Sequence, residues 1–370
     1  MGGTRSGRTA DGIGSAGPLV VSEDERLLES VLRLCAAAGA EPRVVRGAPP
    51  PRQEWSAAGL VLVGDDVAGR LSGIARRPGV LLVGRDLDDQ EVWRRGVGIG
   101  ADHVVFLPDG EAWLLDRIAD AAEGVGPQAL TVAVLGGRGG AGASTLACGL
   151  AVTAAREGHR AVLVDGDPLG GGADVLLGAE AEEGLRWPDL AGSRGRVNAV
   201  ELERALPCGR GLPDLRVLSW DRGDVLGVPA EAVRTVLGAA RRRGGVVVLD
   251  LPRRLDEAVG EALEQADLAL LVVPAELRAM AAAGRVAAAV RMRLRDLRAV
   301  VRCPPGCGMD GDEVARGLRL PLAGELAAEP GIEADLERGR PPGMRARGPL
   351  ARFCSAFLVE VGSRLGEAAA

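Results

Sequence analysis

The sequence predicts an α/β protein built from two doubly wound units, in which helices cover both faces of a mostly parallel sheet. Short runs of valine and leucine alternate with amphipathic segments over residues 18–123, and a second such series covers 131–365. Strands buried on both faces read as continuous apolar runs, and their alternation with helices is typical of parallel sheets. Residues 124–130 contain glycine and proline and form the predicted linker.

The overall composition agrees with this fold class. A chain of 370 residues is long enough for two domains, and 47% hydrophobic residues suffice to pack their cores. Only 2% of the residues are aromatic, so leucine, valine and alanine must fill these cores. All 45 basic residues are arginine. The net charge of −6 argues against broad nucleic-acid binding.

The chain ends and the cysteines indicate the environment of the protein. Residues 1–17 are rich in glycine, serine, threonine and arginine and are predicted to be a disordered leader, and 366–370 form a short tail. No apolar run reaches transmembrane length, and the tail is too small and acidic to insert into a bilayer. Six scattered cysteines without a secretory signal indicate reduced thiols and a cytoplasmic protein.

The first unit shows the pattern of five strands with intervening helices. Strands are expected at 19–21, 43–45, 60–63, 80–83 and 104–106, and helices at 25–38, 89–96 and 111–122. The order and length of these segments resemble the receiver domain of response regulators, which has a flavodoxin-like fold. The resemblance implies a module that binds other proteins or accepts a phosphoryl group.

The residues that a working receiver needs are mostly absent. An acidic pair after the first strand is present at 23–24, but Gly64 stands where an aspartate ends the third strand. Gly84 replaces the hydroxyl residue after the fourth strand, and Leu107 replaces the lysine after the fifth. We therefore expect a degenerate, receiver-like interaction module. Asp65, displaced by one residue, keeps a phospho-acceptor as the alternative.

The second unit is expected to contain a longer series of strands and helices. Strands are predicted at 131–135, 160–164, 215–218, 268–273 and 297–301, with a last sheet position near 321–322. Residues 245–252 give a further buried-strand signal that ends in the carboxylate of Asp250. Helices are predicted at 146–155, 197–206, 230–243, 276–295 and 349–365.

A glycine-rich loop follows the first strand of this unit. Its five glycines are Gly136, Gly137, Gly139, Gly140 and Gly142. Ser144 and Thr145 then open a helix of small residues. A strand, a glycine loop and a helix N-terminus in this order form a phosphate-binding cradle of backbone N–H groups. The usual spacing G-x-x-x-x-G-K-[ST] places lysine at 143, where this chain has Ala143.

Three motifs in order resemble those of the MinD/ParA-type ATPases. Residues 136–145 resemble the deviant Walker A motif, 164–168 resemble a D-x-D-P segment, and 248–252 resemble a Walker B D-x-P segment. A receiver-like module before such a domain resembles the CpaE branch of this superfamily, and the arginine form of the loop is similar to actinobacterial septum site-determining proteins. The resemblance implies a nucleotide-binding fold over residues 131–365.

The resemblance also assigns roles to individual residues. Ser144 and Asp250 would hold Mg²⁺, Asp167 would orient the attacking water, and Asp165 would support the site. Arg138 stands where the family has the signature lysine that reaches across a dimer, so a homodimer is implied. The nucleotide, ATP or ADP, would contact Gly137, Arg138, Gly139, Gly140, Ala141, Gly142, Ala143, Ser144, Thr145 and Arg302.

Two departures weaken the expected ATPase. A charge-assisted contact of the kind lost at Ala143 contributes about 1.5–3 kcal/mol to binding. Hydrolysis should suffer more, because the lysine also stabilises charge that develops on the transferred phosphoryl group. Arg302 replaces an asparagine that commonly reads adenine in this family. We therefore expect weak nucleotide binding with weak or no hydrolysis.

Three functional hypotheses follow from this reading. The first is a MinD- or CpaE-type regulator of cell division or polarity that responds to nucleotide. The second is an active ATPase in which Arg138 or another arginine replaces the missing lysine. The third is an adaptor for a pilus or secretion machine, as the CpaE resemblance implies.

Overall fold

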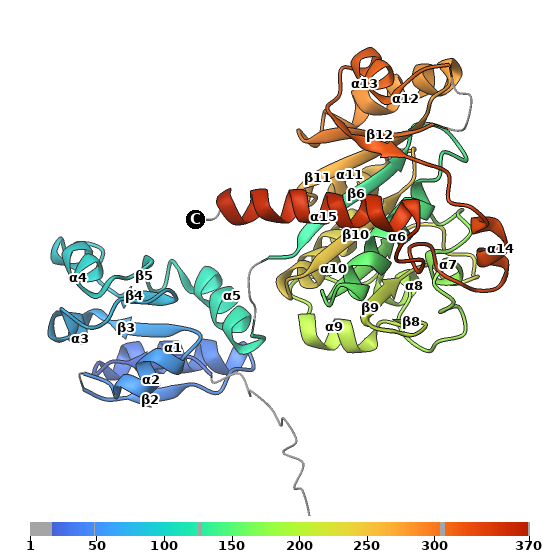
Figure 1. Cartoon of the computed structure of the whole chain (residues 1–370). Helices are drawn as coiled ribbons and strands as arrows, with labels where there is room; N and C mark the ends of the chain where they lie inside the picture. The colour runs from blue at the N-terminus through green and yellow to red at the C-terminus, as the bar shows by residue number, and fades with distance from the viewer. Residues whose placement is uncertain (1–16, 48, 125–127, 304–307, 369–370) are drawn as a thin grey trace, which may run out of the picture. The chain divides into compact units, whose positions relative to one another are not determined.

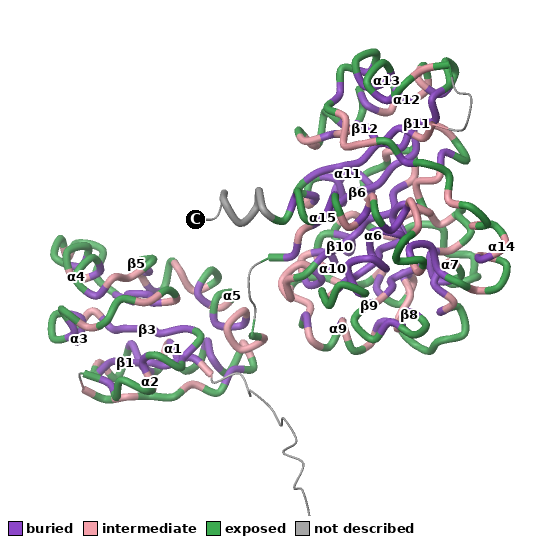
Figure 2. Tube along the Cα trace, in the orientation of Figure 1, coloured by how far each residue is buried: buried purple, intermediate pink, exposed green. Residues whose placement is uncertain are grey.

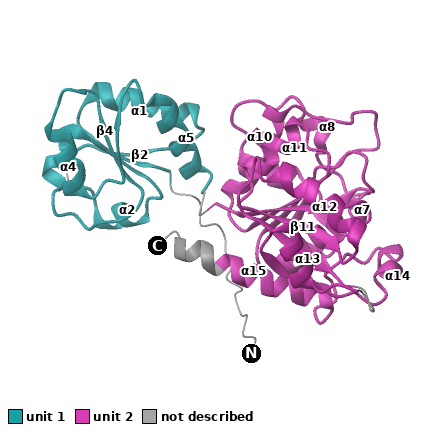
Figure 3. Ribbon diagram, turned by 90° about the horizontal axis from the view of Figure 1, so that it is seen from above, with its two compact units in different colours: residues 1–125 teal, residues 126–370 magenta. Residues whose placement is uncertain are grey.

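The computed structural model describes residues 17–47, 49–124, 128–303 and 308–368, with side chains as far as residue 362. The chain separates into two compact units, Met1–Val125 and Gly126–Ala370 (Figure 3). Apart from Gly17, the predicted leader lies outside the described residues, as do positions 125–127 of the predicted linker.

Unit 1 is a five-stranded parallel sheet with the strand order β2-β1-β3-β4-β5 (Figure 1). Its strands are β1 (Leu19–Val21), β2 (Arg43–Val45), β3 (Val61–Gly64), β4 (Val80–Gly84) and β5 (His103–Phe106). Its helices are α1 (Glu25–Ala37), α2 (Arg52–Ala57), α3 (Asp65–Ala68), the 3-10 helix η1 (Gly69–Leu71), α4 (Glu91–Ile99) and α5 (Glu111–Ala122). The five predicted strands and the flavodoxin-like order of the sheet are confirmed.

The helices of unit 1 differ from the prediction where the local signal was short. α2 and α3 were not predicted, because six and four residues are too few to display a helical period. α4 begins at Glu91 and not at Asp89, since the Asp89 carboxylate accepts the Glu91 amide at 2.9 Å and precedes the helix. It ends at Gly100, whose φ of 68° stops the helix.

Unit 2 contains an eight-stranded sheet with the order β13-β12-β11-β6-β10-β7-β9-β8. Its strands are β6 (Leu130–Gly136), β7 (Ala161–Asp165), β8 (Cys208–Gly209), β9 (Leu212–Leu218), β10 (Val246–Leu251), β11 (Leu268–Pro274), β12 (Leu297–Arg302) and β13 (Leu322–Leu326). Every pair of neighbouring strands is parallel except β8 and β9, which form an antiparallel hairpin. The predicted mostly parallel sheet is confirmed.

The helices of unit 2 cover both faces of this sheet. They are α6 (Ala143–Arg156), α7 (Ala173–Leu176), α8 (Trp187–Leu190), α9 (Ala199–Ala205), α10 (Ala230–Arg242), α11 (Glu257–Glu264), α12 (Leu277–Val290), α13 (Gly311–Leu318), α14 (Ile332–Glu337) and α15 (Pro349–Ala368). Val132 and Val134 of β6 pack into the core layer beneath α6 and α15, whereas Ala133 and Leu135 pack beneath α9 to α13. Figure 2 shows the strands buried between these two layers.

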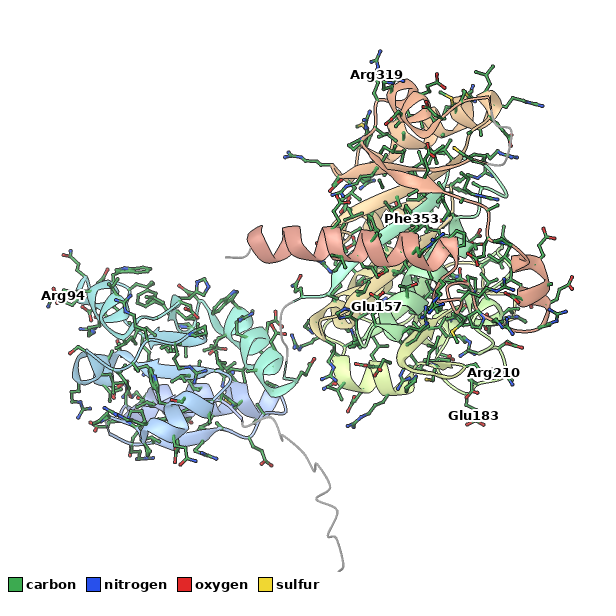
Figure 4. All side chains as sticks on the ribbon, viewed as in Figure 1. Arg94, Glu157, Glu183, Arg210, Arg319 and Phe353 are labelled. Atoms are coloured by element: carbon green, nitrogen blue, oxygen red, sulfur yellow. The ribbon has the colours of Figure 1, made fainter. Side chains whose placement is uncertain are left out.

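α6 is buried because α15 covers it. Its residues from Leu146 to Ala155 are all buried, which explains why this helix consists of small residues. A Cβ at Gly149 would lie 2.9 Å from Leu350 Cγ, so glycine permits the close approach of α15. Phe353, labelled in Figure 4, stacks on Phe357 with a ring distance of 6.3 Å. No helix in the described part of the chain is long and apolar enough to cross a membrane.

Several helices of unit 2 were missed or misjudged in extent. α7, α8, α11, α13 and α14 were not predicted, because each contains eight residues or fewer. α12 ends at Val290 and not at Arg295, since the backbone tightens into turns there, with the Met292 and Arg293 amides donating to the carbonyls of Ala289 and Val290. α15 continues to Ala368, beyond the predicted end at 365 and through part of the predicted tail, whose residues 369–370 lie outside the described ones.

Candidate nucleotide-binding site

The three motifs meet at one edge of the unit 2 sheet. β10 lies between β6 and β7, and Asp250 pairs with Val134 on one side and with Asp165 on the other. Because these strands are parallel, their carboxyl ends and the loops that follow them lie together. The glycine loop after β6, the D-x-D-P segment after β7 and the D-x-P segment of β10 therefore surround one space.

This space is a cavity of about 600 Å³, a size suited to a small ligand. One wall is formed by the glycine loop and the strand-end carboxylates, and the other by the segment after β13, which contributes both apolar and acidic side chains. The lining residues that the argument uses are Arg138, Gly139, Gly140, Ala141, Gly142, Ala143, Ser144, Thr145, Asp167, Asp250, Arg253 and Arg302. Of the predicted nucleotide contacts, Gly137 alone does not line the cavity.

The backbone of the loop explains its glycines. Gly140 and Gly142 have φ values of 69° and 94°, which favour glycine, and Gly142 precedes the first turn of α6. Gly137 has a different purpose. Its N–H donates to the carbonyl of Val272 in β11 at 2.8 Å, and a Cβ there would lie 2.7 Å from Ala283 Cβ. Gly137 thus fixes the loop to the sheet and does not face a ligand.

Ser144 and Asp250 form the predicted metal-binding pair. Ser144 of α6 lies close enough to the Asp250 carboxylate of β10 to lower the pKa of that group. Burial outweighs this effect and raises the pKa of Asp250 to about 7, and the carboxylates of Asp165 and Asp167 raise it further. A buried carboxylate beside two others provides a favourable place for a cation.

These residues fit Mg²⁺ bound together with a phosphate ligand. Hydroxyl and carboxylate oxygens are ligands that Mg²⁺ prefers, and it usually takes few protein ligands beside phosphate and water. No cluster of three or more histidine, cysteine, aspartate or glutamate residues able to hold a metal occurs among the described residues. The Ser144 hydroxyl and the Asp250 carboxylate therefore fit Mg²⁺ that takes its remaining ligands from phosphate and water.

Asp165 and Asp167 have different surroundings. Asp165 is 2% exposed, and its carboxylate accepts hydrogen bonds from Ala173 N at 2.9 Å, Ser219 Oγ at 2.8 Å and Asp167 N at 3.1 Å. Burial raises its pKa. Asp167 is half-buried, lines the cavity and accepts the Leu169 amide at 3.1 Å. Asp165 is thus a positioning residue that shapes the loop, and Asp167 is the carboxylate that can reach a ligand.

The two arginines that the sequence singled out are both engaged by the protein. Arg138 Nη2 lies 2.8 Å from Glu276 Oε1 at the start of α12. Arg302 Nη1 donates to the carbonyl of Ala141 at 2.8 Å, and a Cβ at Gly142 would lie 2.9 Å from the same atom. Arg302 therefore braces the loop from the end of β12.

Sequence reasoning missed a third arginine of the cavity. Arg253 follows the D-x-P segment directly, and its Nη2 lies 3.6 Å from the position that a Cβ on Gly139 would occupy. Its place one residue after the Pro252 of that motif was the signal that could have indicated it. Glu276, the partner of Arg138, gave no comparable signal, because only the fold brings it to the loop.

The corresponding edge of unit 1 has no space for a receiver aspartate. A Cβ at Gly64 would lie 2.2 Å from Asp66 Oδ1 and 2.7 Å from Ser22 Oγ. Asp66 instead accepts hydrogen bonds from Ser22 Oγ at 2.9 Å and from the amides of residues 23 and 24 at 2.7 and 3.0 Å. Asp65 opens α3, half-buried, with its pKa raised by burial. The acidic cluster thus connects loops of the fold.

Comparison with known proteins identifies the family. Residues 21–128 match the model of the Rv3660c-like, CheY-like N-terminal domain. The chain is 39% identical over 330 residues to protein Rv3660c of Mycobacterium tuberculosis, which covers 88% of this chain and 91% of that protein. The chain belongs to the Rv3660c-like family. This member is also 24% identical over 223 residues to the septum site-determining protein MinD of Bacillus subtilis, across 58% of the chain and 81% of MinD.

Solved structures show the same fold for unit 2 of this Rv3660c-like protein. MinD of Aquifex aeolicus matches with a TM-score of 0.53 and 21% identity over 64% of this chain and 98% of MinD. The MinC:MinD complex of the same organism matches with 0.54 and 20%, over 64% and 96%. MinD of Pyrococcus horikoshii, solved with Mg-ADP, matches with 0.52 and 18%, over 64% and 97%. Unit 2 therefore has the MinD/ParA-type fold, and unit 1 is CheY-like.

Proposed function

We propose that this protein is a MinD/ParA-type regulator of septum placement or cell polarity that responds to bound nucleotide. One observation carries the proposal. Ser144 and Asp250, from different motifs, line one cavity beside the glycine loop, while the methyl group of Ala143 stands where the motif usually has lysine. This arrangement supports a site that would bind Mg²⁺ with a nucleotide but that has no cation at the start of α6.

The proposed ligand is ATP or ADP with Mg²⁺, bound weakly. Ser144 would ligate Mg²⁺ through its hydroxyl, and Asp250 would hold the ion from β10, usually through water. The ion would neutralise charge on the phosphate oxygens. Asp167 would orient an attacking water, with Asp165 holding the loop in shape. Turnover is expected to be slow or absent, because no lysine stabilises the charge that develops on the transferred group.

The proposal includes the partners and the place of action. Arg138 is half-exposed, and the proposal is that it reaches a second copy of the chain in a homodimer, with Glu276 as the residue that holds Arg138 in the single chain. The finer assignment is to the actinobacterial septum site-determining protein Ssd, in the CpaE-like branch and in the cytoplasm. MinD of Aquifex aeolicus, solved with MinC, supports a cell-division partner for a protein of this fold.

Binding measurements on the whole chain test the proposal. Titration calorimetry with Mg-ATP, Mg-ADP and Mg-GTP should give weak binding of at least one nucleotide, and ATP turnover should be poor. Ala143→Lys should strengthen binding about ten- to a hundredfold and increase turnover, since it restores one charge-assisted phosphate contact. A native protein that hydrolyses ATP as fast as Bacillus subtilis MinD would end the degenerate-site proposal.

A second candidate is an active ATPase that uses arginine in place of lysine. Three arginines line the cavity, which favours this candidate. Arg138→Ala would abolish turnover in an active ATPase that depends on it, and would leave the slow turnover of the first proposal unchanged. The adaptor for a pilus or secretion machine is the third candidate. It predicts co-purification with an assembly ATPase whether or not nucleotide is present.

A further inference from the structure

The charge at the phosphate loop has to come from a residue other than 143. Ala143 is half-buried at the first position of α6, and its methyl group packs against the apolar core beneath that helix. The cavity also contains the acidic side chains of Asp167, Asp250, Glu329 and Glu333. A phosphate ligand entering this cavity meets several negative charges, so a cation close to the loop would contribute strongly to its binding.

Two of the three arginines of the cavity are already bound by the protein. The guanidinium of Arg138 pairs with Glu276 at 2.8 Å, which offsets its charge. The guanidinium of Arg302 donates to the Ala141 carbonyl at 2.8 Å, so at least one of its N–H groups supports the loop from behind. Both can contribute to the field at the site, but neither is free to turn toward a phosphate without giving up a contact.

Arg253 is the third arginine of the cavity, and its guanidinium is available to bind a ligand. It is exposed, and it lines the same cavity as the glycine loop. Its Nη2 lies 3.6 Å from the position that a Cβ on Gly139 would occupy, so the guanidinium lies beside the open face of the glycine loop. In the part of the chain that the structure describes, no hydrogen bond or ion pair holds its guanidinium.

The backbone before Arg253 places this side chain beside the metal-binding pair. Asp250 and Leu251 belong to β10, which lies at the centre of the sheet, and Pro252 has a fixed φ and restricts the backbone of Leu251 before it. The guanidinium therefore projects from a well-fixed strand end and not from a long loop. Its planar fork of N–H donors matches phosphate oxygens better than an ammonium group does.

We propose that Arg253 supplies the phosphate-binding charge that a lysine at position 143 would otherwise supply. The cation that contacts the phosphate then comes from the segment after β10 and not from the start of α6. This inference rests on the proposed function, because it assumes that the loop binds a nucleotide. It also means that the segment after Asp250 contacts the phosphate of the bound nucleotide directly.

Nucleotide affinity in matched variants of the whole chain tests the assignment. Arg253→Ala should weaken Mg-ATP binding about ten- to a hundredfold in titration calorimetry, which is the range for one charge-assisted contact. Arg254→Ala is the control, because Arg254 is also exposed but does not line the cavity. Arg253→Lys should retain more affinity than Arg253→Ala, since it keeps the charge and loses only the fork.

A double variant separates charge replacement from a merely structural effect. Adding Ala143→Lys to Arg253→Ala should restore most of the lost affinity, because the lysine returns a cation to the loop. Equal affinities of Arg253→Ala and the wild type, or equal losses in Arg253→Ala and Arg254→Ala, would overturn the assignment and leave the proposed function standing. A wild-type chain that binds no Mg-nucleotide would overturn both. Equal melting temperatures of the variants confirm that they are folded.

Discussion

The buried carboxylate of Asp250 is expected to lower the stability of unit 2 while it serves metal binding, and the substitution Asp250→Asn tests both effects. Asp250 is 7% exposed, and burial raises its pKa from an ordinary 3.8 to about 7. At about 1.4 kcal/mol per tenfold change in proton affinity, this corresponds to roughly 4 kcal/mol. Because the pKa of an acid is raised in the folded chain, this cost is absent below pH 3.8 and complete above pH 7. Asp250→Asn should therefore stabilise unit 2 by up to about 4 kcal/mol at pH 8.

Hydrogen exchange of the β10 amides measures this effect within unit 2 itself, because protection reports the free energy of opening of that strand. Protection should be greater in Asp250→Asn than in the wild type at pH 8, and the difference should shrink as the pH falls from 7 toward 4. Asp224→Asn, an exposed carboxylate in the same unit, is the control and should change little. The same Asp250→Asn chain should lose the Mg²⁺ dependence of nucleotide binding. Protection at or below the wild-type level at pH 8 would refute the reasoning.

Three further substitutions test the loop, the receiver-like unit and the ion pair at Arg138. Gly142→Ala should weaken nucleotide binding by about tenfold or more in titration calorimetry, because a φ of 94° strains an L-residue and the new Cβ would lie 2.9 Å from Arg302 Nη1. Gly171→Ala is the control and should leave nucleotide binding unchanged, since nothing lies within 4 Å of the new Cβ. Gly64→Asp should destabilise unit 1 by about 1–3 kcal/mol in thermal unfolding, since its Cβ would lie 2.2 Å from Asp66 Oδ1. Phosphorylation of the new side chain by acetyl phosphate would contradict the view that the end of β3 has no room for a phospho-acceptor. Glu276→Gln should change the free energy of unfolding by less than about 1 kcal/mol, because its ion pair with Arg138 is half-exposed. The same variant should promote nucleotide-dependent dimerisation in sedimentation, because it releases Arg138. An unchanged degree of dimerisation would count against the role of Arg138.

The loop and the carboxylates were predictable because their signals are local. Glycines at 140 and 142 mark backbone conformations that glycine favours, and an aspartate after a buried strand lies at a known edge of a parallel sheet. The short helices were missed for different reasons. α11 and α13 begin with local caps at Asp256 and Asp310, a signal that the sequence analysis did not use, whereas α14 has no side-chain cap. Asp165 was predicted to support the site. Its carboxylate accepts the nearby amide of Ala173, eight positions on, and the hydroxyl of Ser219, 54 positions on, and only the fold brings the second contact to it.

The sequence by itself determined the two α/β units, the order of the motifs and the absence of lysine at 143, because each depends on residue type and spacing along the chain. Only the tertiary structure decided which arginines are bound and which one is available. Glu276 reaches Arg138, Ala141 accepts from Arg302, and Arg253 is placed against Gly139, all across separations that no local pattern encodes. The physical reason is that a parallel sheet brings distant strand ends together, so the charges that meet there are fixed by strand order and not by proximity in the chain.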